Sequence, residues 1–308
     1  MKVMVTGGAG FIGANLIERL VKEGHEVVSL DNYDSGLEEN HIEGVKYENG
    51  DIEMIEYIKG ESFDLCFHLA ALSRIQPSFE NPTETFRVNV RGTEAVMEWA
   101  RHNNVKVVYA GSSSKHHDPT ISPYAMYKYL GEEVCKLYKK TFEVDVEICR
   151  FYNVYGPKEI VDGDWAAVIG IWRNQVNNNQ KITIVGDGEQ RRDFVNVKDV
   201  VQANILAATK ELDDSALGQV YNVGSGVNYS VNEIAKMISD FTVNIDARPG
   251  EAKETLAHIS RIKGTLGWEP TIKVEDWISE QLTPEIPPQN ENPIRRSFDK
   301  IKNWLYGE

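Results

Sequence analysis

The chain has 308 residues, of which 41% are hydrophobic and 26% charged, a composition that fits a globular protein with a large core and excludes a disordered or fibrous chain. Its 47 acidic and 33 basic residues give a net charge of -14, and without a compensating basic run this charge argues against a nucleic-acid partner. The three cysteines are scattered, and no Cys/His spacing matches a zinc site, so we expect neither disulfides nor metal. No stretch approaches the roughly 20 apolar residues that a membrane span needs. We therefore expect a cytoplasmic protein without a membrane segment.

Short apolar runs alternate with helix-period segments through the first half of the chain. This is the pattern of repeated βαβ units around a parallel sheet. Strands are expected at Lys2–Val5, Glu26–Leu30, Val45–Asn49, Asp64–His68, Val105–Ala110 and Val146–Arg150, and helices at Phe11–Glu23, Thr83–His102 and Tyr124–Phe142. Six strands in this order predict a doubly wound α/β sheet, the Rossmann fold.

The regular alternation of strands and helices ends after about residue 153, where Gly, Asn, Asp and Pro become frequent. Isolated strands are expected there at Ile182–Val185 and Gln219–Val223. We therefore predict a Rossmann domain over residues 1–152, to which later strands return, and a smaller lobe over residues 153–282. Residues 283–308 are expected to form a Pro- and Asn-rich linker and an amphipathic helix whose apolar side carries Ile294, Phe298, Ile301, Trp304 and Leu305.

A glycine-rich turn follows the first expected strand and opens the first expected helix. Residues Gly8 to Gly13 fit the G-x-G-x-x-G frame, and Gly7, Gly10 and Gly13 also fit G-x-x-G-x-x-G. Glycines in this setting permit a tight turn, let backbone N–H groups approach a pyrophosphate and direct the helix dipole at it. A plain Gly-rich turn is the alternative, and the strand–turn–helix context favours a dinucleotide site over it.

Acidic residues end the second and third expected strands. Asp31 lies 18 positions after Gly13, where a carboxylate accepts hydrogen bonds from both ribose hydroxyls and repels a 2′-phosphate. This favours NAD over NADP. Asp51 and Ile52 follow the third strand and could bracket the adenine, with an ordinary turn role equally open.

Tyr124 and Lys128 stand four residues apart behind Ser122 and Pro123, which have the pattern of an N-cap and a first helical residue, so the two side chains share a helical face. The spacing alone is weak support, but the helix follows the fifth strand, whose end carries Ser112. A phenol is a poor base at neutral pH unless nearby positive charge, here an ammonium and a nicotinamide, stabilises its anion. The set predicts hydride transfer, with a solvated helix face as the alternative.

Further motifs follow in unbroken order from residue 1 to about 280. They are Thr6–Gly13, Asp51–Ile52, His68–Ala71, Asn89–Thr93, Ser112 with Tyr124 and Lys128, Arg150–Pro157, Gly186–Phe194, Tyr221–Gly224 and Leu266–Pro270. Through these motifs the chain resembles the extended short-chain dehydrogenase/reductases, specifically the NAD-dependent nucleotide-sugar epimerase/dehydratase family.

The resemblance implies a site for each ligand. NAD would be lined by Gly7, Gly10, Phe11, Ile12, Gly13, Asp31, Asn32, Ser35, Gly36, Asp51, Ile52, Leu69, Ala70, Ala71, Ser73, Asn89, Tyr124, Lys128 and Tyr152. The nucleotide-diphosphate sugar would contact Ser112, Asn153, Arg192, Arg248 and Thr255. A guanidinium can donate two parallel hydrogen bonds to phosphate oxygens. A protein with a net negative charge must place such positive groups at the site itself in order to bind an anion. Ordinary surface charges are the alternative for both arginines.

The residues after Ser112 bear on the reaction. Within the family, 4,6-dehydratases carry Asp and Glu after the catalytic Ser or Thr and decarboxylases carry a Glu, whereas this chain has Ser113-Ser114-Lys115. Without a carboxylate there, elimination lacks an obvious proton carrier, so the resemblance implies 4-epimerisation through a transient 4-keto sugar. A 4,6-dehydratase or 4-keto-sugar reductase is the alternative, and a non-catalytic NAD-binding sensor or scaffold is a distant one.

Three further expectations follow from the resemblance. Thr255 falls where a family segment limits the room around C2 of the sugar, and its small size implies that both UDP-glucose and UDP-N-acetylglucosamine types fit. His116 and His117 replace the usual Tyr-Gly and are either extra acid/base groups or plain surface residues. The helices Thr83–His102 and Tyr124–Phe142 resemble those that pair in family dimers, which implies a homodimer.

Overall fold

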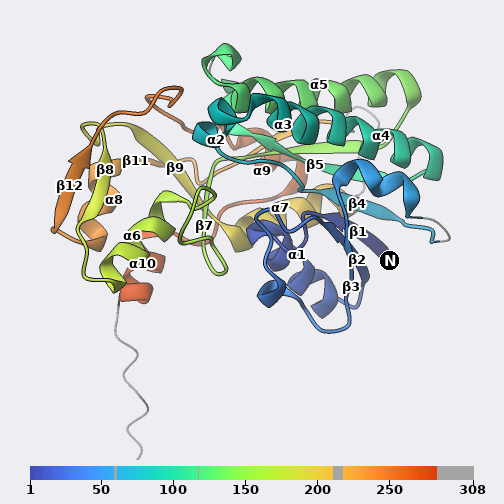
Figure 1. Ribbon diagram of the computed structural model, residues 1–308. Coiled ribbons are helices and arrows are strands. Elements are labelled where there is room, and N and C mark those ends of the chain that lie inside the picture. The colour runs from blue at the N-terminus through green and yellow to red at the C-terminus, as the bar shows by residue number, and fades with distance from the viewer. Residues whose placement is uncertain (59–60, 117, 211–217, 283–308) are drawn as a thin grey trace, which may run out of the picture.

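The computed structural model describes residues 1–58, 61–116, 118–210 and 218–282. A seven-stranded parallel sheet in the order β10-β6-β5-β4-β1-β2-β3 forms the centre of the larger lobe (Figure 1). Its strands are β1 (Lys2–Thr6), β2 (Glu26–Asp31), β3 (Lys46–Asn49), β4 (Leu65–His68), β5 (Lys106–Ser112), β6 (Val146–Phe151) and β10 (Val220–Val223). The predicted Rossmann fold is confirmed, and the chain returns from the smaller lobe to add β10 beside β6.

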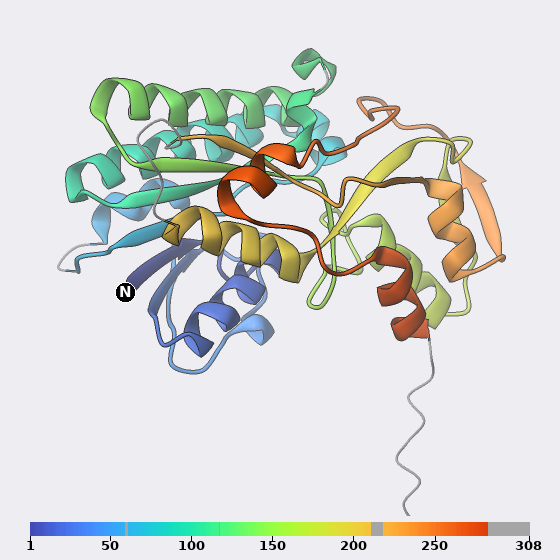
Figure 2. The same cartoon turned by 180° about the vertical axis from the view of Figure 1, so that it is seen from behind.

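Helices cover both faces of this sheet because its strands alternate their side chains between two cores. In β1, Val3 and Val5 join one core and Met4 joins the other. Seen from behind, α7 and α9 lie across the first face, which α1 also covers (Figure 2). The bounds of these helices are α1 (Phe11–Lys22), α7 (Val197–Thr209) and α9 (Ser260–Leu266).

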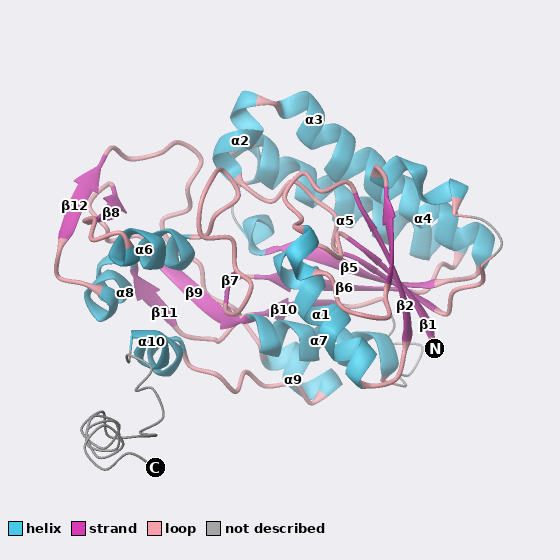
Figure 3. Cartoon of the chain, turned by 60° about the horizontal axis from the view of Figure 1, so that its bottom comes forward, coloured by secondary structure: helices cyan, strands magenta, loops and turns pink. Residues whose placement is uncertain are grey.

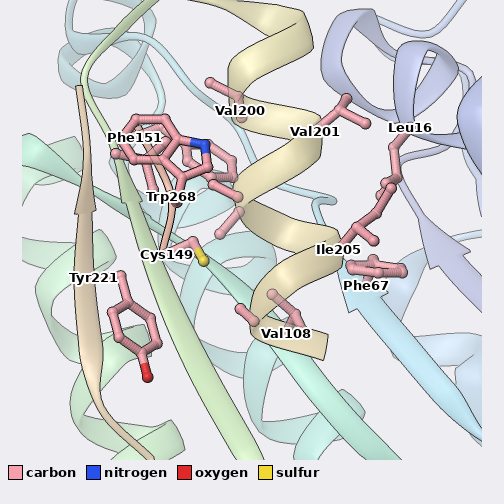
Figure 4. Packing of buried hydrophobic residues seen from close by; sticks show 14 of the residues in the cluster. Leu16, Phe67, Val108, Cys149, Phe151, Val200, Val201, Ile205, Tyr221 and Trp268 are labelled. Carbon is pink, nitrogen blue, oxygen red and sulfur yellow. The ribbon is translucent and has the colours of Figure 1, made fainter. Parts of the chain in front are cut away.

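Apolar side chains of α7 hold that helix against the sheet. Val201 and Ile205 face Leu16 and Phe67, as the close view shows (Figure 4). All four side chains are at least nine-tenths buried. Complete burial of one such side chain stabilises the fold by about 1.5–3 kcal/mol, so this face anchors the sheet that carries the functional loops.

The opposite face is covered by a helical layer whose first part departs from the prediction. A single helix over Thr83–His102 was expected, but α3 (Pro82–Phe86) passes into a π-helical segment, Arg87–Arg91, before α4 (Gly92–Asn103). A π turn inserts one extra residue into the helix, which apolar periodicity does not reveal. The layer is completed by α2 (Ile75–Glu80) and α5 (Pro123–Phe142).

The smaller lobe packs around a third core that contains Trp172, Trp277 and Ile184. Figure 3 shows it beside the large sheet. Its strands are β7 (Asn153–Tyr155), β9 (Arg191–Asn196) and β11 (Asn228–Ser230) in one sheet and β8 (Ile182–Val185) with β12 (Thr242–Ile245) in another, and its helices are α6 (Val168–Asn177), α8 (Val231–Ile238) and α10 (Val274–Leu282). The domain boundaries at residues 152 and 282 stay a prediction.

Short 3₁₀ helices occupy several connections, at Glu38–Asn40, Ile52–Tyr57, Ser113–His116 and Pro119–Ile121. None of the described helices combines the length and apolar character that crossing a bilayer requires. The three cysteines are free and buried. Residues 283–308, with the predicted linker and amphipathic helix, lie outside the described residues.

Candidate active site

A cavity of about 760 Å³ lies where the loops after β1, β4, β5 and β6 meet the smaller lobe. The chain order of the strands reverses between β1 and β4, and ligands of doubly wound sheets bind at such a point. The cavity extends from Gly10 to Arg248, so one space joins the predicted dinucleotide and sugar sites. All predicted site residues line it except Gly36 and Asn89.

The glycine turn is tight enough to require its glycines. Gly7 has a left-handed φ of +72°, and a Cβ at this position would lie 2.8 Å from the backbone nitrogen of Ala70. A Cβ on Gly13 would clash with the carbonyl oxygen of Gly7. Helix α1 starts without a side-chain cap at Gly10, and its first i→i−4 bond is donated by Ala14. The preceding N–H groups have no helical partner and can bind a pyrophosphate.

Asp31 is held by the backbone around it at the end of β2. Its carboxylate accepts hydrogen bonds from Ala9 N at 2.9 Å and Tyr33 N at 2.8 Å. Gly36 does not line the cavity, contrary to the expectation, because it packs behind this carboxylate. A Cβ on Gly36 would lie 2.8 Å from Asp31 Oδ1, so the glycine shapes the position of Asp31.

Asp51 and Ile52 line the cavity at the end of β3. The Asp51 carboxylate is already engaged, since Arg87 donates to both of its oxygens at 2.8 and 2.7 Å. The hydrogen bonds from Arg87 lower the pKa of Asp51, so it stays ionised. Asp51 therefore ties the π-helical segment to the wall of the cavity, and its contact with the adenine stays a prediction.

A buried histidine connects β1, β4 and α4. His68 Nδ1 lies 2.8 Å from Thr6 Oγ1, and its Nε2 lies 3.1 Å from Thr93 Oγ1. Because the Thr93 hydroxyl donates to the carbonyl of Asn89 at 2.8 Å, Nε2 must carry the ring proton and donate to Thr93. Nδ1 then accepts from Thr6. Burial lowers the pKa of His68 to about 3, so the ring stays neutral.

Asn89 braces the loop after β4 instead of contacting the cavity. Its Oδ1 accepts from Leu72 N at 2.8 Å and its Nδ2 donates to Leu72 O at 2.9 Å. The side chain is 1% exposed, and the π-helical segment turns it toward this loop. Asn89 thereby fixes Leu69–Ser73, which do line the cavity, and its direct contact with NAD stays a prediction.

Ser112 and Tyr124 meet in the middle of the cavity. Ser122 caps α5 by accepting from Ala125 N at 3.1 Å, which places Tyr124 in the first turn. The Tyr124 hydroxyl lies 3.3 Å from Ser112 Oγ. Ser114 also donates to that oxygen, from its N–H at 3.2 Å and from its hydroxyl at 2.9 Å. A serine oxygen has two acceptor lone pairs, so at most two of these three donors bind it at once, and the proton of Ser112 can donate into the cavity.

Lys128 lies one turn further along α5 and is buried. Its ammonium donates to the carbonyl of Ala110 at 2.6 Å and lies 4.6 Å from the centre of the Tyr109 ring. Burial lowers the pKa of Lys128 to about 8. Two of its N–H donors remain for a ligand.

A residue that the sequence did not single out adds positive charge near the Tyr124 phenol. Burial raises the pKa of Tyr124, while its hydrogen bond to Ser112 and the positive charge of Arg74 act in the opposite direction. The expectation gave this role to Lys128 and to the nicotinamide. Arg74 lines the cavity as the N-cap residue of α2, and its position directly after the β4 loop was the available signal.

The predicted sugar-site arginines lie at the other end of the cavity. Arg192 is mostly buried and forms an ion pair of 3.3 Å with Glu251, whereas Arg248 is exposed. Thr255 is 8% exposed, and its hydroxyl accepts from Asp193 N at 3.2 Å. This side chain therefore has a structural contact as well as a face on the cavity.

His117 lies outside the described residues, and so do the side chains of Lys115 and His116. The expectation about the two histidines therefore stays a prediction. Among the described residues, no three His, Cys, Asp or Glu side chains come together as a metal site would require.

Comparison with known families settles what kind of protein has this cavity. Residues 3–224 match the model of the NAD dependent epimerase/dehydratase family. The chain belongs to this family. Membership confirms the predicted resemblance, and the family's cofactor, NAD, fits the uncapped helix start and the carboxylate of Asp31. The NAD-dependent epimerase/dehydratase chain is thus an enzyme of nucleotide-sugar metabolism.

Relatives of this epimerase/dehydratase chain match it over most of their length. The UDP-glucose 4-epimerase of Mycolicibacterium smegmatis is 32% identical to this chain over an alignment of 310 residues, and the alignment covers 92% of this chain and 97% of the relative. The crystal structure of UDP-glucose 4-epimerase with UDP-glucose from Thermotoga maritima has a TM-score of 0.83 at 30% identity and covers 90% and 96% of the two chains. The structure of UDP-glucuronic acid 4-epimerase from Bacillus cereus with UDP-glucuronic acid and NAD has a TM-score of 0.80 at 26% identity and covers 91% and 97%.

Proposed function

We propose that the protein is an NAD-dependent 4-epimerase of UDP-linked hexoses or N-acetylhexosamines. The observation that carries the proposal is the meeting of Ser112, Tyr124 and Lys128 in the cavity that begins at the glycine turn. Bound NAD would accept a hydride from C4 of the sugar and return it to the opposite face. The cofactor would therefore be regenerated in each cycle.

Proton transfer at the C4 oxygen would fall to Tyr124. Its hydroxyl is within hydrogen-bond distance of Ser112, whose own proton can bind the reacting oxygen of the sugar. Tyr124 would take the C4 hydroxyl proton as the alcohol is oxidised and give it back as the ketone is reduced. Lys128 would hold the nicotinamide ribose with the two donors that Ala110 leaves free.

The surroundings of Ser112 support epimerisation over elimination. Ser114, two residues on, uses both its N–H and its hydroxyl on Ser112 Oγ. A dehydratase needs a further group there to protonate a leaving hydroxyl, and a serine hydroxyl is a weak acid for that step. The chain therefore offers groups for proton transfer at C4 and, among the described residues beside Ser112, none for loss of water.

The rest of the cavity would bind the nucleotide diphosphate and the sugar. Arg192 and Arg248 would contact the diphosphate, with Asn153 beside them. Thr255 would face C2 of the sugar, where its small side chain leaves room for an N-acetyl group. The sugar must turn over between the two hydride transfers, and a cavity of about 760 Å³ has room for both ligands.

We also propose a homodimer and a cytoplasmic setting. Leu137 and Phe142 are 54% and 46% exposed on α5, one of the two helices expected to pair. Exposed apolar side chains of this kind are ones that dimer interfaces bury. A reducing cytoplasm would keep the three free cysteines unpaired.

The test is incubation of the purified protein, without added cofactor, with UDP-glucose, UDP-N-acetylglucosamine, UDP-glucuronate and GDP- and dTDP-sugars. The proposal predicts conversion of a UDP-sugar to its C4 epimer and loss of that conversion in Tyr124→Phe. A 4-keto-6-deoxy product or net consumption of NADPH would instead show a dehydratase or reductase. Cellular activity that survives Tyr124→Phe would show a non-catalytic role.

A further inference from the structure

The first turn of α5, which carries Tyr124, is completed from another part of the chain. Pro123 is the first helical residue and has no N–H to satisfy. Ala125 donates to the Ser122 hydroxyl at 3.1 Å, and Met126 donates to the carbonyl oxygen of Ser122 at 3.1 Å, which is the first regular bond of the helix. The remaining N–H of this turn, that of Tyr124, must find its acceptor outside α5.

The acceptor is a serine of α2, which lies 46 residues earlier in the chain. Tyr124 N donates to Ser78 Oγ at 3.0 Å, and Ser78 is 1% exposed. The Ser78 hydroxyl itself donates to the carbonyl of Ile75 at 2.6 Å, within α2. Because the proton is used inside α2, a lone pair of the oxygen remains for the Tyr124 N–H. Ser78 therefore caps α5 from a neighbouring helix.

Helix α2 is held in turn by the smaller lobe. Gln76 Nε2 donates to the carbonyl of Pro249 at 2.9 Å, and Arg74 Nε donates to the carbonyl of Trp165 at 3.0 Å. These two carbonyls belong to separate loops of the smaller lobe. The short helix is thus tied on both sides, so Ser78 offers α5 a fixed point of attachment.

The position of the Tyr124 backbone matters because its side chain must reach across the cavity. The Tyr124 hydroxyl lies 3.3 Å from Ser112 Oγ, at the end of β5. Helix ends fray, and a small rotation of the backbone in the first turn is magnified at the far end of a tyrosine side chain. A bond at the Tyr124 N–H opposes that rotation directly.

We infer that Ser78 is a positioning residue, whose hydroxyl fixes the backbone of Tyr124 so that the phenol meets Ser112 at the reacting oxygen of the substrate. Ser78 does not line the cavity, so it acts through Tyr124 rather than on a ligand. This inference rests on the proposed 4-epimerase function and adds a residue of α2 to the machinery of that reaction.

The kinetic test is Ser78→Ala, assayed with the UDP-sugar that the wild type epimerises. It should lower kcat by about 10- to 100-fold, because a displacement of about 1 Å of a reacting group costs up to about 100-fold. KM should stay unchanged, since no contact with the substrate is removed. An unchanged kcat, or a rise in KM alone, would overturn the inference.

The matched control is Ser230→Ala. Ser230 is 4% exposed and caps α8 in the smaller lobe by accepting from Glu233 N at 3.1 Å. Each variant loses one helix cap, so the unfolding temperatures should fall to a similar extent, whereas Ser230→Ala should keep the wild-type kcat. Equal losses of kcat in the two variants would show general destabilisation and would overturn the positioning role.

A second variant covers the case in which Ser78→Ala does not fold. Ser78→Cys keeps nearly the same shape but replaces the oxygen with sulfur, which is a weak acceptor. Its kcat should fall below that of the wild type at an unchanged KM. A wild-type kcat in Ser78→Cys would overturn the inference.

Hydrogen exchange tests the contact without any activity. The Tyr124 amide should exchange about tenfold faster in Ser78→Ala than in the wild type, while the Ala125 amide, which Ser122 caps, should change less. Unchanged exchange at Tyr124 would overturn the inference. If the wild type epimerises no UDP-sugar, the proposed function fails, and the exchange result alone then decides whether Ser78 holds Tyr124.

Discussion

Lys128 is a residue whose burial has a measurable consequence for stability. Its pKa is lowered to about 8 from an ordinary 10.5 by burial, with Cys135 and Glu132 acting in the opposite direction. Between those two pH values the unfolded chain binds the proton that the folded chain has lost. The free energy of unfolding must therefore rise with pH across that window, because the unfolded state binds more protons there.

Chemical denaturation of the wild type and Lys128→Met between pH 6 and 11 measures this effect. The wild type should gain about 3 kcal/mol relative to the variant between about pH 8 and 10.5, and the difference should be constant below pH 8. Methionine has a similar volume but no charge, so groups that titrate elsewhere cancel in the comparison. A pH-independent difference would show that the ammonium is well solvated or paired.

Thr255 is expected to control the room around C2 of the sugar. Thr255→Tyr would narrow that end of the cavity and should lower kcat/KM for UDP-N-acetylglucosamine at least about tenfold more than for UDP-glucose, the scale of a misfit in a binding pocket. The variant also loses the hydrogen bond to Asp193 N, so its unfolding midpoint must be measured alongside. An equal loss on both sugars would show that Thr255 does not control the room around C2.

Residues whose role depends on local spacing could be predicted from the sequence. The glycine turn, Asp31 and the Tyr124–Lys128 pair line the cavity because strand ends and helix periodicity place them there. The contacts of Gly36, Asn89 and Arg74 could not be predicted in this way. Each one's role depends on contacts between segments distant in the chain, such as the bonds from Asn89 to Leu72 and from Arg74 to Trp165.

Among the elements, α5 matters most because it carries both Tyr124 and Lys128. It packs closely on the sheet at Gly131, where a Cβ would clash with the Tyr109 hydroxyl and lie 2.9 Å from the carbonyl oxygen of Asn89. The glycine thereby sets the distance between the helix and the strand that ends in Ser112.

Gly131→Ala should therefore destabilise the protein by about 1–3 kcal/mol through overpacking and lower the proposed epimerase activity by displacing α5. Gly264→Ala is the matched control, because Gly264 lies in α9 and a Cβ at that position would point into open space. That substitution should stabilise the helix by about 0.5–1 kcal/mol. Thermal unfolding of both variants checks the contrast, and equal effects would contradict the close packing of α5.

The elements themselves were predicted more completely than the breaks within them. The six predicted strands form with shifts of one or two residues at their ends, because apolar runs and turn residues mark them. The π-helical segment at Arg87–Arg91 was not predicted, since its extra residue leaves the apolar pattern readable as one helix. Asn89 lies in that segment, and its side chain bonds to Leu72 in the loop after β4.

At the scale of the whole molecule, the return of β10 to the sheet joins the two lobes through more than one crossing of the chain. The parallel order could be predicted from alternating strands and helices, and the exact neighbour of the last strand could not. Local sequence does not encode that pairing, which depends on the edge left open beside β6.

The proposed homodimer predicts that α5 contributes to an interface. Leu137→Glu should convert a dimer to a monomer at micromolar concentration, because it places a charge in an apolar contact. Val227→Glu is the control, since Val227 is 53% exposed against 54% for Leu137 and lies in the other lobe. Sedimentation velocity distinguishes the outcomes, and a wild-type monomer or a dimeric Leu137→Glu would reject this interface.

The central claim is that the hydride leaves C4 and returns to the same carbon within one active site. The most direct measurement is NMR of a UDP-sugar labelled with deuterium at C4 and incubated in ordinary water without added cofactor. The account predicts the C4 epimer with deuterium retained at C4 and no accumulating reduced cofactor. Replacement of the label by solvent hydrogen, or a product with an altered C6, would contradict it.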